Sequence, residues 1–96
     1  MPLKIFHVIG TGPKDKWDYF SDFVCIAPDA AHAQRSFPKD GIYWSESSET
    51  WIGPDGEIFS NLGEWDATPA TVEVVEIGTA HKGASHSIVC TSFHAG

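Results

Sequence analysis

Short apolar runs of strand length mark the start of the chain. Residues 3–9 (LKIFHVI) place apolar side chains on both faces of an extended chain, which predicts a central strand. Residues 23–27 form a second such run, and residues 10–13 (GTGP) break the chain after the first. We expect these two strands to pair as a hairpin with a long loop.

The spacing of apolar residues changes to that of a helix after the second strand. Ala30, Ala33 and Phe37 fall on one helical face. Pro28 suits the first helical position because it has no N–H to leave unpaired, and Pro38 disfavours helix at the residue before it. One helix is therefore predicted between these two prolines.

The most clearly marked turn is Pro54-Asp55-Gly56, which lies between two short apolar runs. Such a sequence predicts a β-hairpin, here over residues 50–59. Polar, turn-rich segments flank it on both sides. We therefore expect the hairpin to project from the domain.

Residues 71–77 (TVEVVEI) and 87–93 (SIVCTSF) are rich in β-branched residues and predict two further strands, joined as an antiparallel hairpin. A right-handed crossover through the helix places the third strand beside the first, so the predicted spatial order is 2-1-3-4. The expected fold class is α+β: an antiparallel four-stranded sheet, one helix on one face and the inserted hairpin. With 96 residues, the chain is expected to form a single domain, 1–96.

Acidic residues gather in the second half of the chain. The first 39 residues carry five bases and four acids, whereas residues 40–81 carry nine acids and no lysine or arginine. A domain with a net charge of −7 repels nucleic acid and is attracted to basic surfaces. The plain alternative is that the charge only keeps the protein soluble.

Aromatic residues lie among these acids and suggest a surface that binds a basic protein. Carboxylates would supply the charge, and buried aromatic rings would anchor the partner. The alternative, which we favour for the rings, is that they form the hairpin's own small core. The candidate residues are Glu46, Glu49, Asp55, Glu57, Glu64 and Asp66 for charge, with Trp44 and Trp51 as anchors.

No pattern in the chain predicts an active site, a metal or a cofactor. Cys25 and Cys90 lie in apolar runs, where a thiol behaves as a small core residue. The histidines at positions 81, 86 and 94 match no established metal-ligand spacing. A serine nucleophile at Ser92, with His94 and Asp22, lacks the strand-turn-helix context that activates such a residue.

Two other functions remain open. A small enzyme or ligand-binding protein would use His7, His94 and residues 17–22 around a pocket at the end of the sheet, although His7 itself is expected to be a satisfied imidazole near the core. A virion or scaffold component would self-associate. No apolar run approaches the ~20 residues of a membrane span, so we expect a cytoplasmic monomer or small homo-oligomer.

Four segments resemble a group of small proteins from tailed phages, prophages and their hosts. They are residues 17–25 (WDYFSDFVC), 27–35 (APDAAHAQR), 65–72 (WDATPATV) and 92–96 (SFHAG). Trp17 and His94 stand where that group has tyrosine and asparagine. The resemblance covers nearly all of the chain except residues 42–63, which it implies are an insertion carrying the acidic hairpin. The resemblance implies a phage accessory protein acting in the host cytoplasm. With the acidic surface, it suggests an inhibitor of a host nucleic-acid-handling factor, such as a CRISPR complex or a restriction enzyme.

Overall fold

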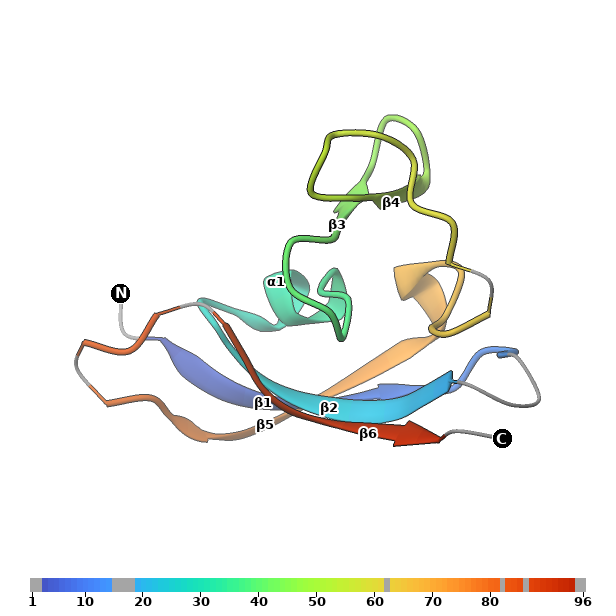
Figure 1. Ribbon diagram of the computed structural model, residues 1–96. Coiled ribbons are helices and arrows are strands. Elements are labelled where there is room, and N and C mark those ends of the chain that lie inside the picture. Colours follow the sequence, from blue (N-terminus) through green and yellow to red (C-terminus); the bar gives the residue numbers. More distant parts are fainter. Residues whose placement is uncertain (1–2, 15–18, 62, 82, 86, 95–96) are drawn as a thin grey trace.

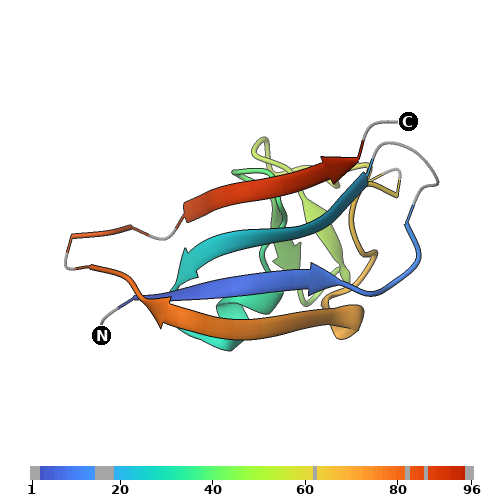
Figure 2. The same cartoon turned by 90° about the horizontal axis from the view of Figure 1, so that it is seen from below.

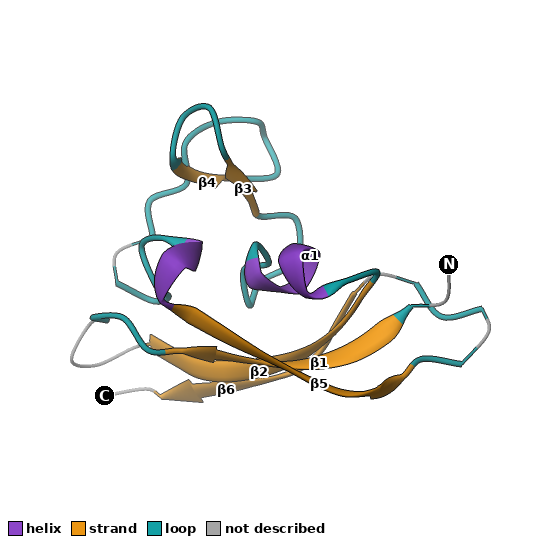
Figure 3. Cartoon of the chain, turned by 180° about the vertical axis from the view of Figure 1, so that it is seen from behind, coloured by secondary structure: helices purple, strands orange, loops and turns teal. Residues whose placement is uncertain are grey.

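One antiparallel sheet forms the base of the molecule, and the helix and a small second sheet lie over the same face of it (Figures 1 and 3). The computed structural model describes residues 3–14, 19–61, 63–81, 83–85 and 87–94. The elements in chain order are β1 (Lys4–Gly10), β2 (Tyr19–Ala27), α1 (Ala30–Gln34), β3 (Tyr43–Ser45), β4 (Thr50–Ile52), a 3-10 turn η1 (Pro69–Thr71), β5 (Val72–Thr79) and β6 (Ser87–His94).

The main sheet has the strand order β5-β1-β2-β6, and every neighbouring pair is antiparallel (Figure 2). The α+β class, the four antiparallel strands and the central place of β1 were predicted correctly. The predicted order was right for β2-β1-β5. It was wrong for β6, which pairs with β2 instead of forming a hairpin with β5.

The last strand covers an edge of β2 that would otherwise be open. β2 is nine residues long, and an unpaired strand of that length exposes a row of backbone donors and acceptors to other chains. The connection from β5 to β6 crosses three strand spacings, about 14 Å. A seven-residue link over 80–86 reaches about 23 Å when extended, so the crossing needs no strain.

The face of the sheet beneath the helix carries the core. Phe6 and Val8 of β1 and Phe23 and Cys25 of β2 are at most 1% exposed and alternate with residues on the outer face. Trp65 packs edge-on against Phe23 with ring centroids 5.2 Å apart. One continuous cluster of buried side chains runs from the sheet past α1 into the insertion.

The helix is shorter than predicted. The Asp29 carboxylate caps it by accepting a hydrogen bond from His32 N at 2.9 Å. Hydrogen bonds from the His32 side chain and then its backbone hold the pKa of Asp29 below its ordinary value, so the cap weakens as pH falls through that range. Phe37 lies beyond the helix, where Ser36 pairs with Tyr43 as an isolated bridge.

The insertion forms its regular strand pair at a turn that was not predicted. β3 and β4 pair across residues 45–50, where Glu49 adopts a left-handed conformation with φ of 50°. The predicted turn at residues 54–56 is present, but its second arm makes only a single bridge, between Ile52 and Ile58. The turn predicted within residues 50–59 is therefore confirmed. The regular strand pair expected on its two sides is wrong, because the paired strands are β3 and β4.

Candidate functional site

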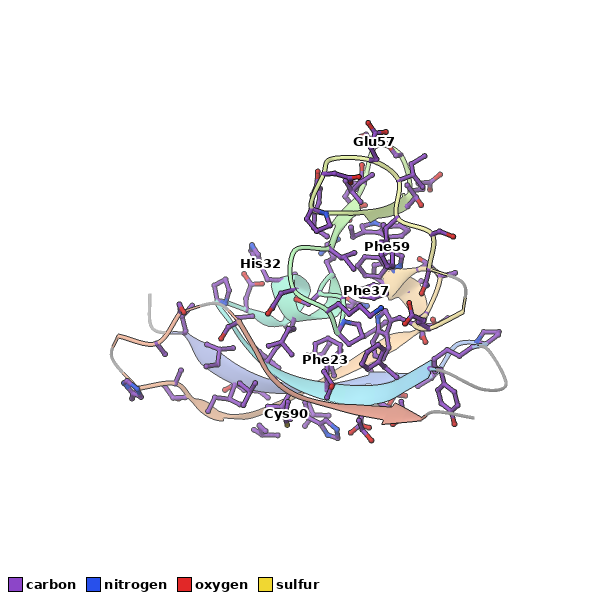
Figure 4. The ribbon with its side chains drawn as sticks, viewed as in Figure 1. Phe23, His32, Phe37, Glu57, Phe59 and Cys90 are labelled. Atoms are coloured by element: carbon purple, nitrogen blue, oxygen red, sulfur yellow. The ribbon has the colours of Figure 1, made fainter. Side chains whose placement is uncertain are left out.

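The insertion carries its exposed acids at the end farthest from the sheet. Residues 45–49 and 53–58 form this end, which we call the acidic tip (Figure 1). Glu46, Glu49, Asp55 and Glu57 are all exposed there. Figure 4 shows Glu57 at the outermost point of the tip. The structure thus brings four of the six predicted acids to one exposed region.

Two of the predicted acids form ion pairs with basic residues of the same chain. Arg35 Nε donates to Glu46 Oε1 at the edge of the tip. Lys39 Nζ lies 2.9 Å from Glu64 Oε2, and the Glu64 side chain is only 20% exposed. Glu46 and Glu64 therefore already have basic partners within the chain, which weakens their case as groups for another protein.

The two predicted aromatic anchors belong to the interior of the insertion. Trp44 and Trp51 are cross-strand partners, with ring centroids 5.2 Å apart. Trp51 is 2% exposed, packs on Phe37 at 5.2 Å and donates its indole N–H to Asp66 O at 3.0 Å. Trp51 is therefore wrong as an anchor because no partner reaches it. The alternative that these rings form a core is confirmed for Trp51, and Trp44 is half-buried against the same cluster.

The exposed apolar residues of the insertion are different ones. Tyr43 is 55% exposed and Ile58 is 72% exposed. Backbone pairing puts Tyr43 opposite Ile52 and Ile52 opposite Ile58. Directly paired residues share a face of a sheet, so these three side chains form a row on the side away from Trp44, in which the exposed Tyr43 and Ile58 flank the buried Ile52. Sequence reasoning missed this row because it placed the strand pairing around the wrong turn.

Asp66 is fully buried and ties together segments far apart in sequence. Its carboxylate accepts hydrogen bonds from Gly12 N at 2.8 Å, Lys14 Nζ at 2.8 Å and Thr71 Oγ1 at 2.6 Å. Lys14 also donates to the carbonyl oxygens of Gly10 and Gly12. Asp66 is therefore wrong as a docking residue. The glycine loop after β1 surrounds this internal carboxylate, which gives the loop a structural role.

His7 and Asp22 meet on the outer face of the main sheet. His7 Nε2 lies 2.7 Å from Asp22 Oδ2, and Ser21 Oγ donates to Asp22 Oδ1 at 2.7 Å. The structure thus brings together His7 and Asp22 of the alternative ligand site. His7 is a satisfied imidazole as predicted. Its predicted place near the core is wrong, because its side chain is 35% exposed on the outer face of the sheet. Residues 17 and 18 and the side chain of His94 lie outside the described part of the chain.

The cysteines occupy opposite faces of the sheet and are both free thiols. Cys25 is buried in the core, as predicted, and burial raises the pKa of its thiol to about 11. Cys90 was wrongly predicted to be a core residue. It pairs with Val24 on the edge strand β6 and is exposed. Since Val24 and Cys25 point to opposite faces, the two thiols do not form a disulfide.

These environments predict a large difference in reactivity at pH 8. Cys90 should react fast with Ellman's reagent, whereas Cys25 should react only after urea unfolds the chain, because the thiolate is the nucleophile and Cys25 stays protonated. The folded state also holds the Cys25 proton more tightly, so stability should fall as pH rises from about 9 towards 11. Cys90→Ser is the control. Two equally fast thiols in the wild type would contradict this assignment.

Within the described ranges, no three histidine, cysteine or acidic residues are placed to hold a metal ion. His86 of the predicted histidine set lies outside those ranges. No described helix is long and apolar enough to cross a membrane. No protein-family model, curated protein or solved structure matches this chain.

Proposed function

We propose that the protein is a non-enzymatic binding module that docks on a basic surface of another protein through its acidic tip. The supporting observation is that Glu49, Asp55 and Glu57 are exposed and form no ion pair among the described residues. Exposed Tyr43 and Ile58 lie in the same insertion. Unpaired carboxylates steer a basic partner, and apolar side chains supply area to bury.

The base of the insertion is built to hold the tip in one orientation. Phe37 packs edge-on against Trp51 and Phe59, with ring centroids 5.2 and 5.3 Å away. The Lys39–Glu64 ion pair and the Trp51 indole N–H bond fasten the same region to its neighbours. A preorganised surface loses less conformational entropy when it binds, which supports docking by a fixed projection.

The partner we propose is a host nucleic-acid-handling protein in the cytoplasm. Exposed carboxylates can replace the phosphates that such a protein normally contacts, and the net charge of −7 disfavours direct binding of nucleic acid. The resemblance to phage and prophage proteins supports an anti-defence role for this binding, such as inhibition of a CRISPR complex.

A pull-down from bacterial lysate tests the proposal. Tagged protein should capture a basic nucleic-acid-binding protein at low salt and release it at raised salt, because the attraction between exposed charges is screened. Added nucleic acid should compete for the same partner. Capture that resists both salt and nucleic acid would contradict an acidic docking surface, as would an empty eluate.

An apolar variant of the tip separates docking from simple charge attraction. Ile58→Ser should weaken capture by about tenfold, since an anchoring side chain commonly contributes more than 1 kcal/mol. The fold should be kept because Ile58 is 72% exposed. Val89→Ser is the matched control, on β6 of the main sheet and 55% exposed. Equal capture by both variants would remove Ile58 from the interface.

A further inference from the structure

A cavity of about 420 Å³ lies where α1, the segment after it and the start of β6 come together. Phe37, Ile42, Trp44 and Ile88 give it apolar walls, and Tyr43 forms part of its lining. This volume lies in the range of small-molecule sites, which are apolar with a few polar groups. None of the candidate residues from the sequence, apart from Trp44, lines this cavity.

The lining of this cavity is richer in basic than in acidic residues, although the chain as a whole is acidic. The cations Arg35 and Lys39 line it together with His32, whereas its only acid is Asp40. The whole chain has thirteen acids and six lysine or arginine residues. Two of those six cations are therefore gathered at one apolar hollow. Figure 4 places His32 on the solvent side of α1 and Phe37 between α1 and the insertion.

The two strong cations keep hydrogen-bond donors for a ligand. Arg35 uses Nε for Glu46 and Nη1 for the carbonyl oxygen of Ala31, which leaves three of the five guanidinium N–H groups. Lys39 donates a hydrogen bond to Glu64, and its ammonium also lies 5.9 Å from the centre of the Phe59 ring. An ammonium has three N–H donors, so Lys39 still has donors for a ligand. The side chains of Arg35 and Lys39 are 46% and 44% exposed. Exposed ion pairs are weak, so an incoming anion can compete with these two carboxylates.

We propose that this cavity binds a small acid with a flat apolar body, such as an aromatic ring carrying a carboxylate or phosphate. The ring would lie against Trp44 and Ile88, and the acidic group would face Arg35 and Lys39. A neutral ligand would leave those donors unused. The cavity adjoins the acidic tip, because Tyr43 lines it and Arg35 bonds Glu46 at the edge of the tip. The proposal does not depend on what the tip binds.

Titration of ¹⁵N-labelled protein with indole-3-acetate, and separately with the matched neutral indole-3-acetamide, tests this site. The acetate should shift the amide signals of Ser36, Ile42, Ser87 and Ile88, which come from two separate parts of the cavity wall. The acetamide should bind at least about tenfold more weakly, because a hydrogen bond to a charged group contributes more than a neutral one.

Variants identify the cations and exclude a general effect of charge. Arg35→Gln and Lys39→Gln should each raise the dissociation constant of indole-3-acetate by about tenfold. Lys4→Gln removes the same charge from an exposed ion pair with Glu76 on the main sheet and should leave it unchanged. Three results would each overturn the proposal. They are equal binding of acetate and acetamide, shifts confined to the outer face of the sheet, and no shifts when the probe is present at about 10 mM.

Discussion

Replacing Asp66 by asparagine is expected to lower the free energy of unfolding by about 3–5 kcal/mol. The change keeps the shape of the side chain but leaves the Lys14 ammonium, which is 9% exposed, without its counter-ion. It also turns the amide NH2 either towards the Lys14 ammonium or towards Gly12 N–H and Thr71 Oγ1, and all three of these groups donate to the carboxylate in the wild type. Urea denaturation followed by tryptophan fluorescence measures the loss.

Two further variants show whether the missing pair causes that loss. Glu73→Gln removes an exposed charge on β5 and should change stability by no more than about 0.5 kcal/mol. Lys14→Met combined with Asp66→Leu removes both charges and should recover part of the stability. The recovery is incomplete because Gly12 N–H loses the carboxylate as its acceptor. If Asp66→Asn unfolds at the same urea concentration as the wild type, the buried pair does not hold the loop after β1 to the start of β5.

Truncation of Phe37 to alanine should cost about 3–5 kcal/mol. The ring is 1% exposed and lies between the helix and the insertion, where it contacts Trp51 and Phe59. Its removal leaves a cavity at the base of the acidic tip. We expect a lower urea midpoint, together with faster hydrogen exchange of the Trp51 indole N–H, whose bond to Asp66 O depends on this packing.

The control for Phe37 is a residue of the same insertion that packs against little. Ile58→Ala should lie within about 0.5 kcal/mol of the wild type, because Ile58 is 72% exposed. Unchanged indole exchange in Phe37→Ala would show that the insertion keeps its structure without the aromatic contact. The proposed fixed orientation of the tip would then lose its main support.

The central part of the fold could be predicted because it is encoded locally. Apolar residues on both faces of residues 3–9 identified β1 as a central strand, and each strand of the main sheet was recognised from its own composition. The place of β6 was not encoded in this way. Both β2 and β5 offer a free edge of a three-stranded core, and the composition of residues 87–93 does not distinguish them. In the structure β6 pairs with β2.

The acidic composition of the candidate site was predicted from the sequence, but the strand pairing and the burial of its residues were not. The acidic character of the insertion is visible in the sequence, but the turn with Glu49 at positive φ lacks the glycine or asparagine that usually marks such a turn. That error placed the strand pairing around residues 54–56 and hid the fact that Trp51 faces inward while Tyr43 faces outward. The buried Asp66 carboxylate pairs with Lys14, which is 52 positions away in the sequence. No local sequence pattern therefore predicts that Asp66 is buried.

Charge reversal at the acidic tip is the most direct test of the proposed docking. Tagged wild type, Glu49→Lys with Glu57→Lys, and the control Glu73→Lys with Glu76→Lys should be compared in one pull-down at low salt. Both variants change the net charge equally, and the control acids are exposed on β5 of the main sheet. We predict that the tip variant loses the basic partner while the control retains it. Retention of the partner by the tip variant, or equal loss from both, would contradict docking through the tip.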